Sequence, residues 1–174
     1  MVFALFFDSA LLFDFGEANT DASRNWRVIN DGVMGGLSQG RAHLKENSLL
    51  FVGKISLENN GGFSSLRSPF KRFDLSGKEY IVIRYRNTGY PMAFCMETSR
   101  QWFQPNYKYS LNDQSGKWVE ERIPLKDFYA YRIGRRLDRK LTSQSLSKII
   151  RIGFISDAKQ AGPFELEVDY IRFE

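Results

Sequence analysis

Apolar and polar residues alternate with a period of two along most of the chain, which predicts antiparallel β-sheets with one buried and one wet face. The clearest example lies near the end, where Phe164, Leu166, Val168 and Tyr170 are separated by acidic residues. Comparable runs recur at short spacing, bounded by Asn, Gly, Ser and Pro. The strands expected from this pattern span residues 3–7, 11–15, 49–57, 62–67, 79–86, 92–97, 117–123, 148–155 and 164–170.

The segment 58–62, Glu-Asn-Asn-Gly-Gly, separates two of the expected strands. Asn-Gly is the strongest short hairpin signal, because both residues tolerate a positive φ. We therefore predict that residues 49–57 and 62–67 pair as a β-hairpin. A helical turn at 143–148 is the only expected departure from β structure. The strand spacing predicts one all-β domain over residues 1–174, a jelly-roll sandwich of mostly antiparallel strands with at most short helices.

Composition agrees with this fold and excludes several kinds of active site. The 15 phenylalanines favour strands, since aromatic side chains fit pleated, half-buried surfaces. One cysteine, Cys95, and one histidine, His43, exclude an intrachain disulfide and a Cys/His zinc site. No nucleotide-binding, serine-hydrolase or metalloprotease motif occurs. We therefore expect a binding domain that is not an enzyme, with no cofactor and no metal, although a calcium site of oxygen ligands stays open.

The net charge of the chain indicates the kind of partner to expect, and residues 1–7 indicate its location. The net charge of +5 favours an acidic partner but is too small to indicate nucleic-acid binding. Residues 1–7 are apolar, yet they lack the basic region of a signal peptide and are too short to span a bilayer. From these features we expect a soluble, cytoplasmic protein of bacterial type, with no signal or transit peptide and no membrane span.

Two segments are candidates for contact with a partner. Residues 101–109 interleave rings with amides, so the rings either stack on a sugar, anchor a protein interface, or alternate into the core of an ordinary strand. Residues 132–140 are rich in arginine and form either a solvated loop or a site for a carboxylate, a phosphate or an acidic protein. The candidate partner- or ligand-binding residues are Trp102, Tyr107, Tyr109, Arg132, Arg135 and Arg136.

The stretch 30–38, Asn-Asp-Gly-Val-Met-Gly-Gly-Leu-Ser, is the most unusual in the chain. Its three glycines permit a positive φ and close approach of the backbone. We interpret it as a tightly folded connection that places Val33 and Met34 in the core. The alternative is an anion-binding nest made by successive exposed amides.

This stretch and the segment 51–67 resemble the signature of the complex I intermediate-associated protein 30 family, and the resemblance extends over nearly the whole chain. It implies a galactose-binding-like jelly-roll sandwich and no catalytic residue set. It also implies a protein partner, such as respiratory-complex subunits or assembly intermediates, because mitochondrial members are assembly chaperones for complex I. A carbohydrate-binding module is the alternative function. The family-motif residues, which we expect to be structural, are Trp26, Asn30, Asp31, Gly32, Met34, Gly35, Gly36, Asn59, Asn60, Gly61, Gly62 and Arg67.

Overall fold

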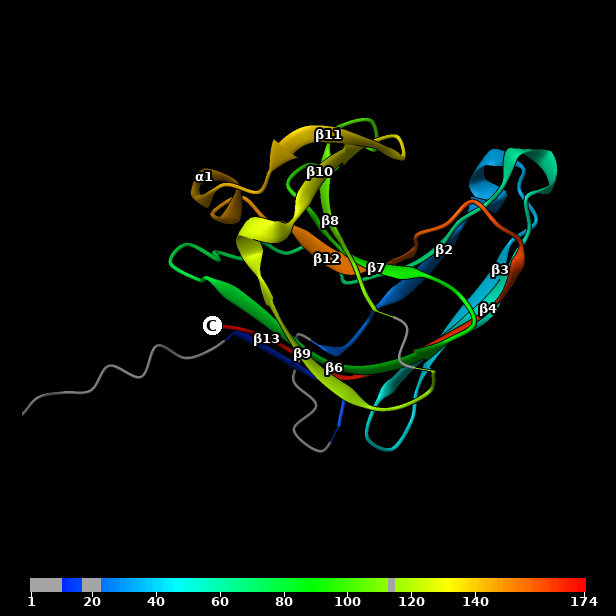
Figure 1. Ribbon diagram of the computed structural model, residues 1–174, viewed down its shortest axis with the longest axis horizontal. Coiled ribbons are helices and arrows are strands. Elements are labelled where there is room, and N and C mark those ends of the chain that lie inside the picture. Colours follow the sequence, from blue (N-terminus) through cyan, green and yellow to red (C-terminus); the bar gives the residue numbers. More distant parts are fainter. Residues whose placement is uncertain (1–10, 17–22, 113–114) are drawn as a thin grey trace, which may run out of the picture.

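The computed structural model describes residues 11–16, 23–112 and 115–174, which form two antiparallel sheets packed face to face (Figure 1). Sheet A contains, in spatial order, β3 (Gln39–Leu44), β4 (Leu49–Ile55), β13 (Gly162–Phe173), β6 (Tyr80–Thr88) and β9 (Val119–Pro124), with β1 (Leu11–Asp14) also paired to β13. Sheet B contains, in spatial order, β11 (Arg135–Lys140), β10 (Tyr129–Arg132), β8 (Asn106–Ser110), β7 (Met92–Glu97), β12 (Arg151–Ser156), β5 (Ser64–Arg67) and β2 (Arg27–Asn30). The predicted all-β, galactose-binding-like sandwich is confirmed.

Short helical turns complete the described chain. They are η2 (Asp31–Met34), η3 (Glu58–Asn60), η4 (Leu125–Asp127) and α1 (Ser143–Leu146). Helix α1 begins within the predicted helical turn at 143–148, and the hydroxyl of Thr142 caps it by accepting a hydrogen bond from the Ser145 amide. These turns connect strands and leave the sheets to determine the shape of the molecule.

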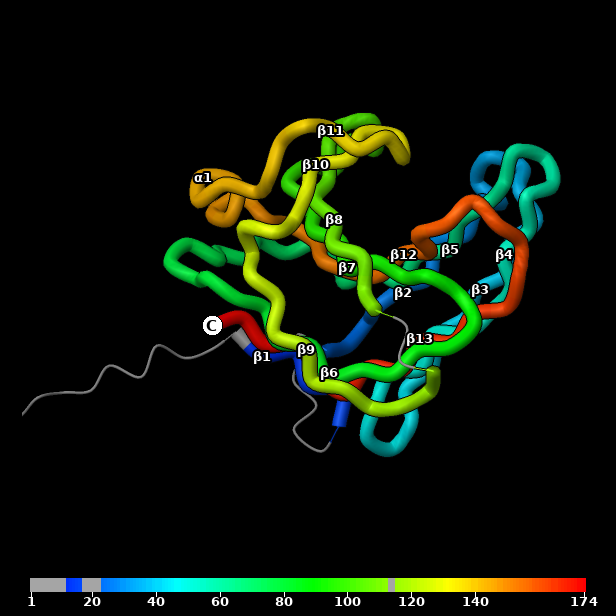
Figure 2. Tube along the Cα trace, in the orientation of Figure 1, coloured from blue at the N-terminus to red at the C-terminus, as the bar shows by residue number. Residues whose placement is uncertain are grey.

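Aromatic side chains from both sheets fill the space between them. Phe94 of β7 packs edge-on against Phe154 of β12 with ring centroids 5.2 Å apart, and Phe51 and Phe164 of sheet A lie 4.7 Å apart. Trp26, a residue of the family motif, packs against Phe15 at the edge of this core. Figure 2 shows the path of the chain through the two layers that enclose the core. Each fully buried Phe contributes about 1.5–3 kcal/mol of burial free energy, so the core needs no disulfide.

The predicted hairpin between residues 49–57 and 62–67 is wrong. Strand β4 pairs with β3 and β13 in sheet A, whereas β5 pairs with β2 and β12 in sheet B. The connection contains Asn59 and Asn60, both with left-handed backbone at φ 54 and 58, and it carries the chain from one sheet to the other. The chain does turn at this Asn-Gly segment, but the turn connects the two sheets instead of two neighbouring strands.

Strand predictions succeeded for most strands with a clear buried face and failed for several short or exposed strands. The strands expected near 11–15, 79–86, 92–97, 117–123, 148–155 and 164–170 are present, and the strand expected at 3–7 lies outside the described residues. Strands β2, β3, β10 and β11 were not expected, and β8 was weighed only as one alternative for residues 101–109. Residues 132–140 form the end of β10, a turn and β11 rather than a loop. Strands β3 and β11 are edge strands with mostly exposed side chains, and β2 and β10 have four residues each, which leaves little length for an alternating pattern.

Candidate functional site

A buried carboxylate, Asp31, joins the two glycine-rich stretches of the chain. Asp31 is 1% exposed and begins η2. Its Oδ1 accepts a hydrogen bond from the Ser38 amide at 2.9 Å, and its Oδ2 accepts from the Ser38 hydroxyl at 2.6 Å. Oδ2 also accepts from the amides of Gly62 at 2.6 Å and Phe63 at 3.2 Å. The carboxylate therefore fastens η2 to the crossover that follows η3.

These hydrogen bonds keep Asp31 ionised inside the protein. Burial alone would raise the pKa of this carboxyl group, because the charged form loses its water. The bonds from the Ser38 hydroxyl and from the amides of Gly62, Ser38 and Phe63 outweigh burial and hold the pKa below its usual value. The site thus requires an acceptor, and a carboxylate is the side chain that offers only acceptors.

Two positions of the motif, Gly36 and Gly61, lie so close to Asp31 that they leave no space for a side chain. A Cβ atom on Gly36 would overlap the carboxyl carbon, and one on Gly61 would lie 2.6 Å from Oδ2. Gly61 itself has φ −68, so the positive φ values expected at the Asn-Gly pair fall instead on Asn59 and Asn60. Space, rather than backbone conformation, explains the glycine at position 61.

Asn30 fastens the other side of the same turn. Its Oδ1 accepts hydrogen bonds from the Gly40 amide at 3.0 Å and from the Ser64 hydroxyl at 2.6 Å. Its Nδ2 donates to the Gly40 carbonyl at 3.2 Å. Because Gly40 belongs to β3 and Ser64 to β5, Asn30 connects an edge of sheet A to sheet B. The Asn-Asp pair of the motif therefore clamps this turn to both sheets.

The clamped turn presents apolar side chains to solvent, and the prediction that Val33 and Met34 lie in the core is wrong. Val33 is 76% exposed and Met34 is 69% exposed, and Leu37 and Leu57 are exposed as well. Figure 1 shows η2 and η3 side by side at the upper right of the sandwich. The turn buries Asp31 instead, because its carboxylate accepts hydrogen bonds from Ser38, Gly62 and Phe63. We call Val33, Met34, Leu37 and Leu57 the apolar tip.

The amides of the motif do not form an open anion-binding nest. The Gly35 amide donates to the Gly32 carbonyl at 3.1 Å, and the Gly36 amide donates to the Asp31 carbonyl at 3.0 Å. The Gly62 amide is bound to the Asp31 carboxylate. The glycines thus serve the turn itself, and Gly35 ends η2 with φ 86.

A second surface lies on the outer face of sheet B, where two arginines share one carboxylate. Arg67 Nη1 lies 2.7 Å from Glu97 Oε1, and Arg151 contacts the same carboxylate through Nε at 3.0 Å and Nη2 at 2.8 Å. All three side chains are largely buried. Between them lie the small residues Cys95 and Gly153, which face each other in register. The triad leaves one positive charge on this face.

Further basic side chains continue across the same face. Lys108 of β8 pairs with Asp157 at 2.6 Å and lies 4.1 Å from the ring centre of Tyr131. Arg136 lies 3.5 Å from the ring centre of Tyr129, and Lys140 reaches the same ring. Arg27 of β2 stands opposite Arg67. We call this outer surface of sheet B the basic face, after Arg27, Arg67, Lys108, Arg136, Lys140 and Arg151.

The rings predicted to bind a ligand are divided between solvent and core. Trp102 is 76% exposed in the loop between β7 and β8. Tyr107 is 7% exposed, with its hydroxyl 2.8 Å from that of Ser145, and Tyr109 packs on Phe128 at 5.5 Å. The two tyrosines therefore face the core as alternate residues of a strand, and they offer no ring to a partner.

The three predicted arginines lie together at the β10–β11 hairpin. Arg136 is part of the basic face, whereas Arg132 donates to the Phe103 carbonyl at 3.2 Å and holds the Trp102 loop against the hairpin. Arg135 is exposed beside the turn. Sequence reasoning missed Glu97, Lys108 and Arg151. Their positions, alternating with buried apolar residues in strands, would have placed them on an outer face had the strand neighbours been known.

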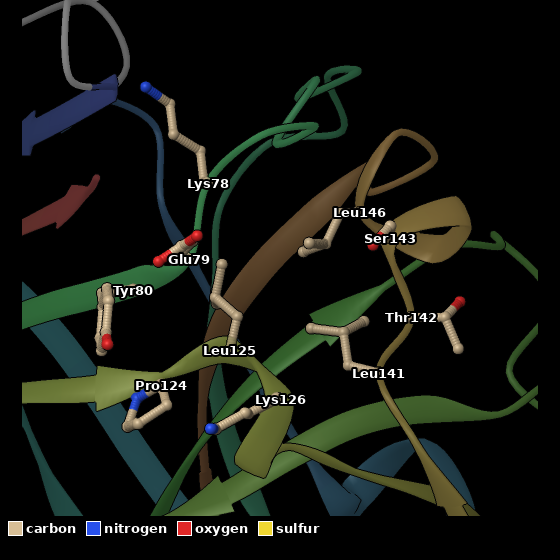
Figure 3. Close-up of a pocket in the computed structure, with 10 residues that line it drawn as sticks. All are labelled: Lys78, Glu79, Tyr80, Pro124, Leu125, Lys126, Leu141, Thr142, Ser143 and Leu146. Atoms are coloured by element: carbon tan, nitrogen blue, oxygen red, sulfur yellow. The ribbon is translucent and has the colours of Figure 1, made fainter.

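A pocket of about 330 Å³ lies between the start of β6, η4 and α1 (Figure 3). Leu125, Leu141 and Leu146 gather at its centre, with Lys78 and Lys126 on its rim. The residues that line it include one carboxylate and neither histidine nor cysteine. They bring together no pair of groups for acid–base or nucleophilic catalysis.

The remaining candidates for a reactive or metal-binding site in the described residues are Cys95, His43 and clusters of acidic side chains. Burial raises the pKa of the Cys95 thiol to about 11, so the thiol stays protonated at neutral pH. His43, the single histidine of the chain, is exposed on β3. Residues 11–16, 23–112 and 115–174 contain no cluster of acidic, histidine or cysteine side chains that could hold a metal. Within the same ranges, no helix has the length and apolar character needed to cross a bilayer.

Comparison with known proteins reveals relatives in animals. The chain is 29% identical to "Complex I intermediate-associated protein 30, mitochondrial" of Mus musculus over 167 residues, which cover 84% of this chain and 51% of the mouse protein. The protein of the same name from Drosophila melanogaster is 25% identical over 170 residues, covering 92% of this chain and 55% of the fly protein. The chain therefore spans about half the length of these curated relatives.

Among solved structures, the fold resembles a family 11 carbohydrate-binding module from a cellulosomal cellulase of Clostridium thermocellum. The TM-score is 0.65 with 16% sequence identity, and the match covers 94% of this chain and 93% of the module. At this identity the likeness shows a shared sandwich fold. It adds independent support for the galactose-binding-like architecture.

The relatives overturn one prediction. A cytoplasmic protein of bacterial type was expected, but the mouse and fly relatives are both named as mitochondrial proteins. The prediction is wrong because it relied on the composition of the first few residues. A short apolar segment is weaker evidence about location than the similarity of most of the chain to two mitochondrial proteins.

The family itself follows from the match over the folded chain. Residues 13–168 match the family model described as "Complex I intermediate-associated protein 30 (CIA30)". The match includes the Asn30–Asp31 clamp, the glycines packed against it and most of both sheets. The chain belongs to the complex I intermediate-associated protein 30 family.

Proposed function

We propose that this chain is a non-catalytic, protein-binding module that acts in the assembly of respiratory complex I in mitochondria. Membership of the family supports this role, and the names of the mouse and fly relatives agree with it. One structural observation carries the proposal: the most distinctive motif of the chain uses a buried carboxylate to hold an apolar tip in solvent.

The apolar tip has the properties of a protein-binding hot spot. Val33 and Met34 are adjacent and strongly exposed, and Leu37 and Leu57 extend the apolar area. Burying a side chain of this size in an interface contributes about 1.5–3 kcal/mol. Because Asp31 fixes the backbone of the turn, binding would order little further structure, which favours affinity. These side chains are exposed rather than packed in the core, so they are accessible to a partner.

The test combines cross-linking of the tagged chain in its native cells with mass spectrometry of the captured proteins. We expect enrichment of complex I subunits or assembly intermediates with the unmodified chain. The double variant Val33→Ser, Met34→Ser should lose more than about 90% of that enrichment, because about 2 kcal/mol of binding energy corresponds to a roughly 30-fold weaker affinity. The matched control is Leu44→Ser, which changes an exposed leucine on β3 instead.

Two results would contradict the proposal. One is capture of no respiratory subunit by the unmodified chain, and the other is equal capture by the tip variant and the control. Since the substituted side chains are exposed, thermal unfolding of the purified variants should stay within about 2 °C of the parent. This check separates loss of binding from loss of folding.

Carbohydrate binding is the second candidate, and one observation favours it. Trp102 and Phe103 pack edge to face at 6.0 Å on an exposed loop beside sheet B, where a ring could stack on a sugar. The proposal predicts glycan-array binding that Trp102→Ala abolishes without changing the thermal stability. An array without signal at millimolar glycan would remove this candidate.

A further inference from the structure

The geometry points to a second binding site, separate from the apolar tip: the basic face of sheet B takes an extended, acidic peptide segment. The ligand class is a protein strand rich in Asp or Glu, laid across the sheet. The basic face shares no residue with the apolar tip, which lies at the η2 and η3 turns (Figure 1).

The charges of the basic face are not balanced within the protein. Its cations outnumber the carboxylates paired with them, which are Glu97, Asp157 and Asp127, the last lying 3.8 Å from Lys140 Nζ. Arg27 stands directly opposite Arg67 across two strands, an arrangement of like charges that costs stability. The excess has the same sign as the net charge of +5 of the whole chain. A carboxylate-bearing partner would relieve the repulsion.

The hydrogen-bonding groups of the face also call for acceptors. Glu97 occupies Nη1 of Arg67 and Nε and Nη2 of Arg151, while Nη2 of Arg67 and Nη1 of Arg151 have no bond to a described residue. The carboxylates of an acidic peptide supply acceptors that match the planar donors of these arginines.

The aromatic rings of the face favour a peptide over a sugar. Tyr131 is covered by Lys108, and Tyr129 lies against Arg136 and Lys140. Their π-faces are thus engaged by cations of the protein itself and offer no flat platform for a pyranose. The face spans the strands from β5 to β11, roughly 24 Å at the usual strand spacing, which matches about seven residues of extended chain.

The test measures fluorescence anisotropy of a fluorescein-labelled heptapeptide of alternating serine and glutamate, titrated with the purified chain. We expect saturable binding that weakens at least fivefold between 50 mM and 300 mM salt, while the peptide with glutamine in place of glutamate does not bind. The double variant Arg136→Gln, Lys140→Gln should weaken binding at least fivefold. Arg151→Lys, which keeps the charge but loses the planar fork, should weaken it about threefold or more.

The matched control is Arg41→Gln, which removes one exposed charge from β3 on sheet A. We expect it to change the dissociation constant less than twofold, and the tip variant Met34→Ser to leave it unchanged. No binding at millimolar protein, or an equal loss with Arg41→Gln, would overturn the site. Tighter binding of an oligogalacturonate than of the peptide would also overturn it, because the face would then be a site for acidic glycans.

Discussion

Replacing Asp31 by asparagine tests the central role given to the buried carboxylate. The change keeps the size and shape of the side chain but turns one acceptor oxygen into a donor. If the amide takes the place of Oδ2, it faces the N–H groups of Gly62 and Phe63, and two hydrogen bonds become two donor–donor contacts. If the amide flips, the same conflict arises at the Ser38 N–H group.

The size of the effect follows from the number of bonds lost. The flipped orientation costs less, because its oxygen keeps the Gly62 and Phe63 bonds and the conflict is confined to the Ser38 N–H group. Hydrogen bonds to a charged group contribute about 1.5–3 kcal/mol each, so Asp31→Asn should lower the free energy of unfolding by about 1.5–3 kcal/mol. A domain of this size has about 5–15 kcal/mol in total, so the loss is measurable although the side chain touches neither a ligand nor the aromatic core.

The assay is urea unfolding followed by tryptophan fluorescence, since Trp26 packs in the core. The control is Asp138→Asn, an exposed residue of β11, which should change stability by less than about 0.5 kcal/mol. Folding lowers the pKa of Asp31, so the stability that its charge contributes is complete above the unfolded pKa of about 3.9 and is lost as the pH falls through the folded pKa. The gap between parent and variant should narrow below about pH 4. A difference under 1 kcal/mol at pH 7, or one that stays constant down to pH 2, would refute the reasoning.

Three further predictions concern the same fold. Gly36→Ala should lower the melting temperature by several degrees, because its Cβ would overlap the carboxyl group of Asp31, whereas Gly32→Ala, with open space around it, should have little effect. Cys95 should resist a thiol reagent at pH 8 in the folded protein and react fully in urea, since its pKa is raised to about 11; fast reaction of the native protein would contradict this. Glu167→Gln should cost about 2–4 kcal/mol in urea unfolding at pH 7, because this buried carboxylate accepts bonds from a serine, a lysine and an arginine, and an unchanged midpoint would show that the cluster adds nothing.

The sequence allowed the fold to be predicted where burial leaves a periodic trace. Strand β13 alternates because one of its faces meets the core, so the pattern alone located it. The turn at 30–38 was recognised as tightly folded, but the wrong side chains were assigned to its interior. Burial of Asp31 in place of Val33 depends on donors from Gly62 and Phe63, about thirty positions away in the chain, and no local rule of polarity anticipates that.

The basic face lay further beyond the reach of a single sequence. Arg67, Glu97 and Arg151 come from three strands of sheet B that are widely separated in the chain. Their contact depends on the order and register of the strands, which alternation does not determine. The arginines near position 135 were recognised because they are neighbours in sequence. The chemistry of these side chains could be recognised from the sequence, but the strands that bring them together could not.

The place of β13 in the middle of sheet A also governs how the protein is made. This strand pairs with β4 and β6 along its length and with β1 at its end, and it follows all of them in the chain. At a synthesis rate of ~5–20 residues per second, β4 leaves the ribosome roughly ten seconds before the strand that it must pair with. During that interval β4 and β6 expose unpaired backbone edges, which are prone to aggregation. We therefore expect molecular chaperones to protect the nascent chain from aggregation until residues 162–173 have been synthesised.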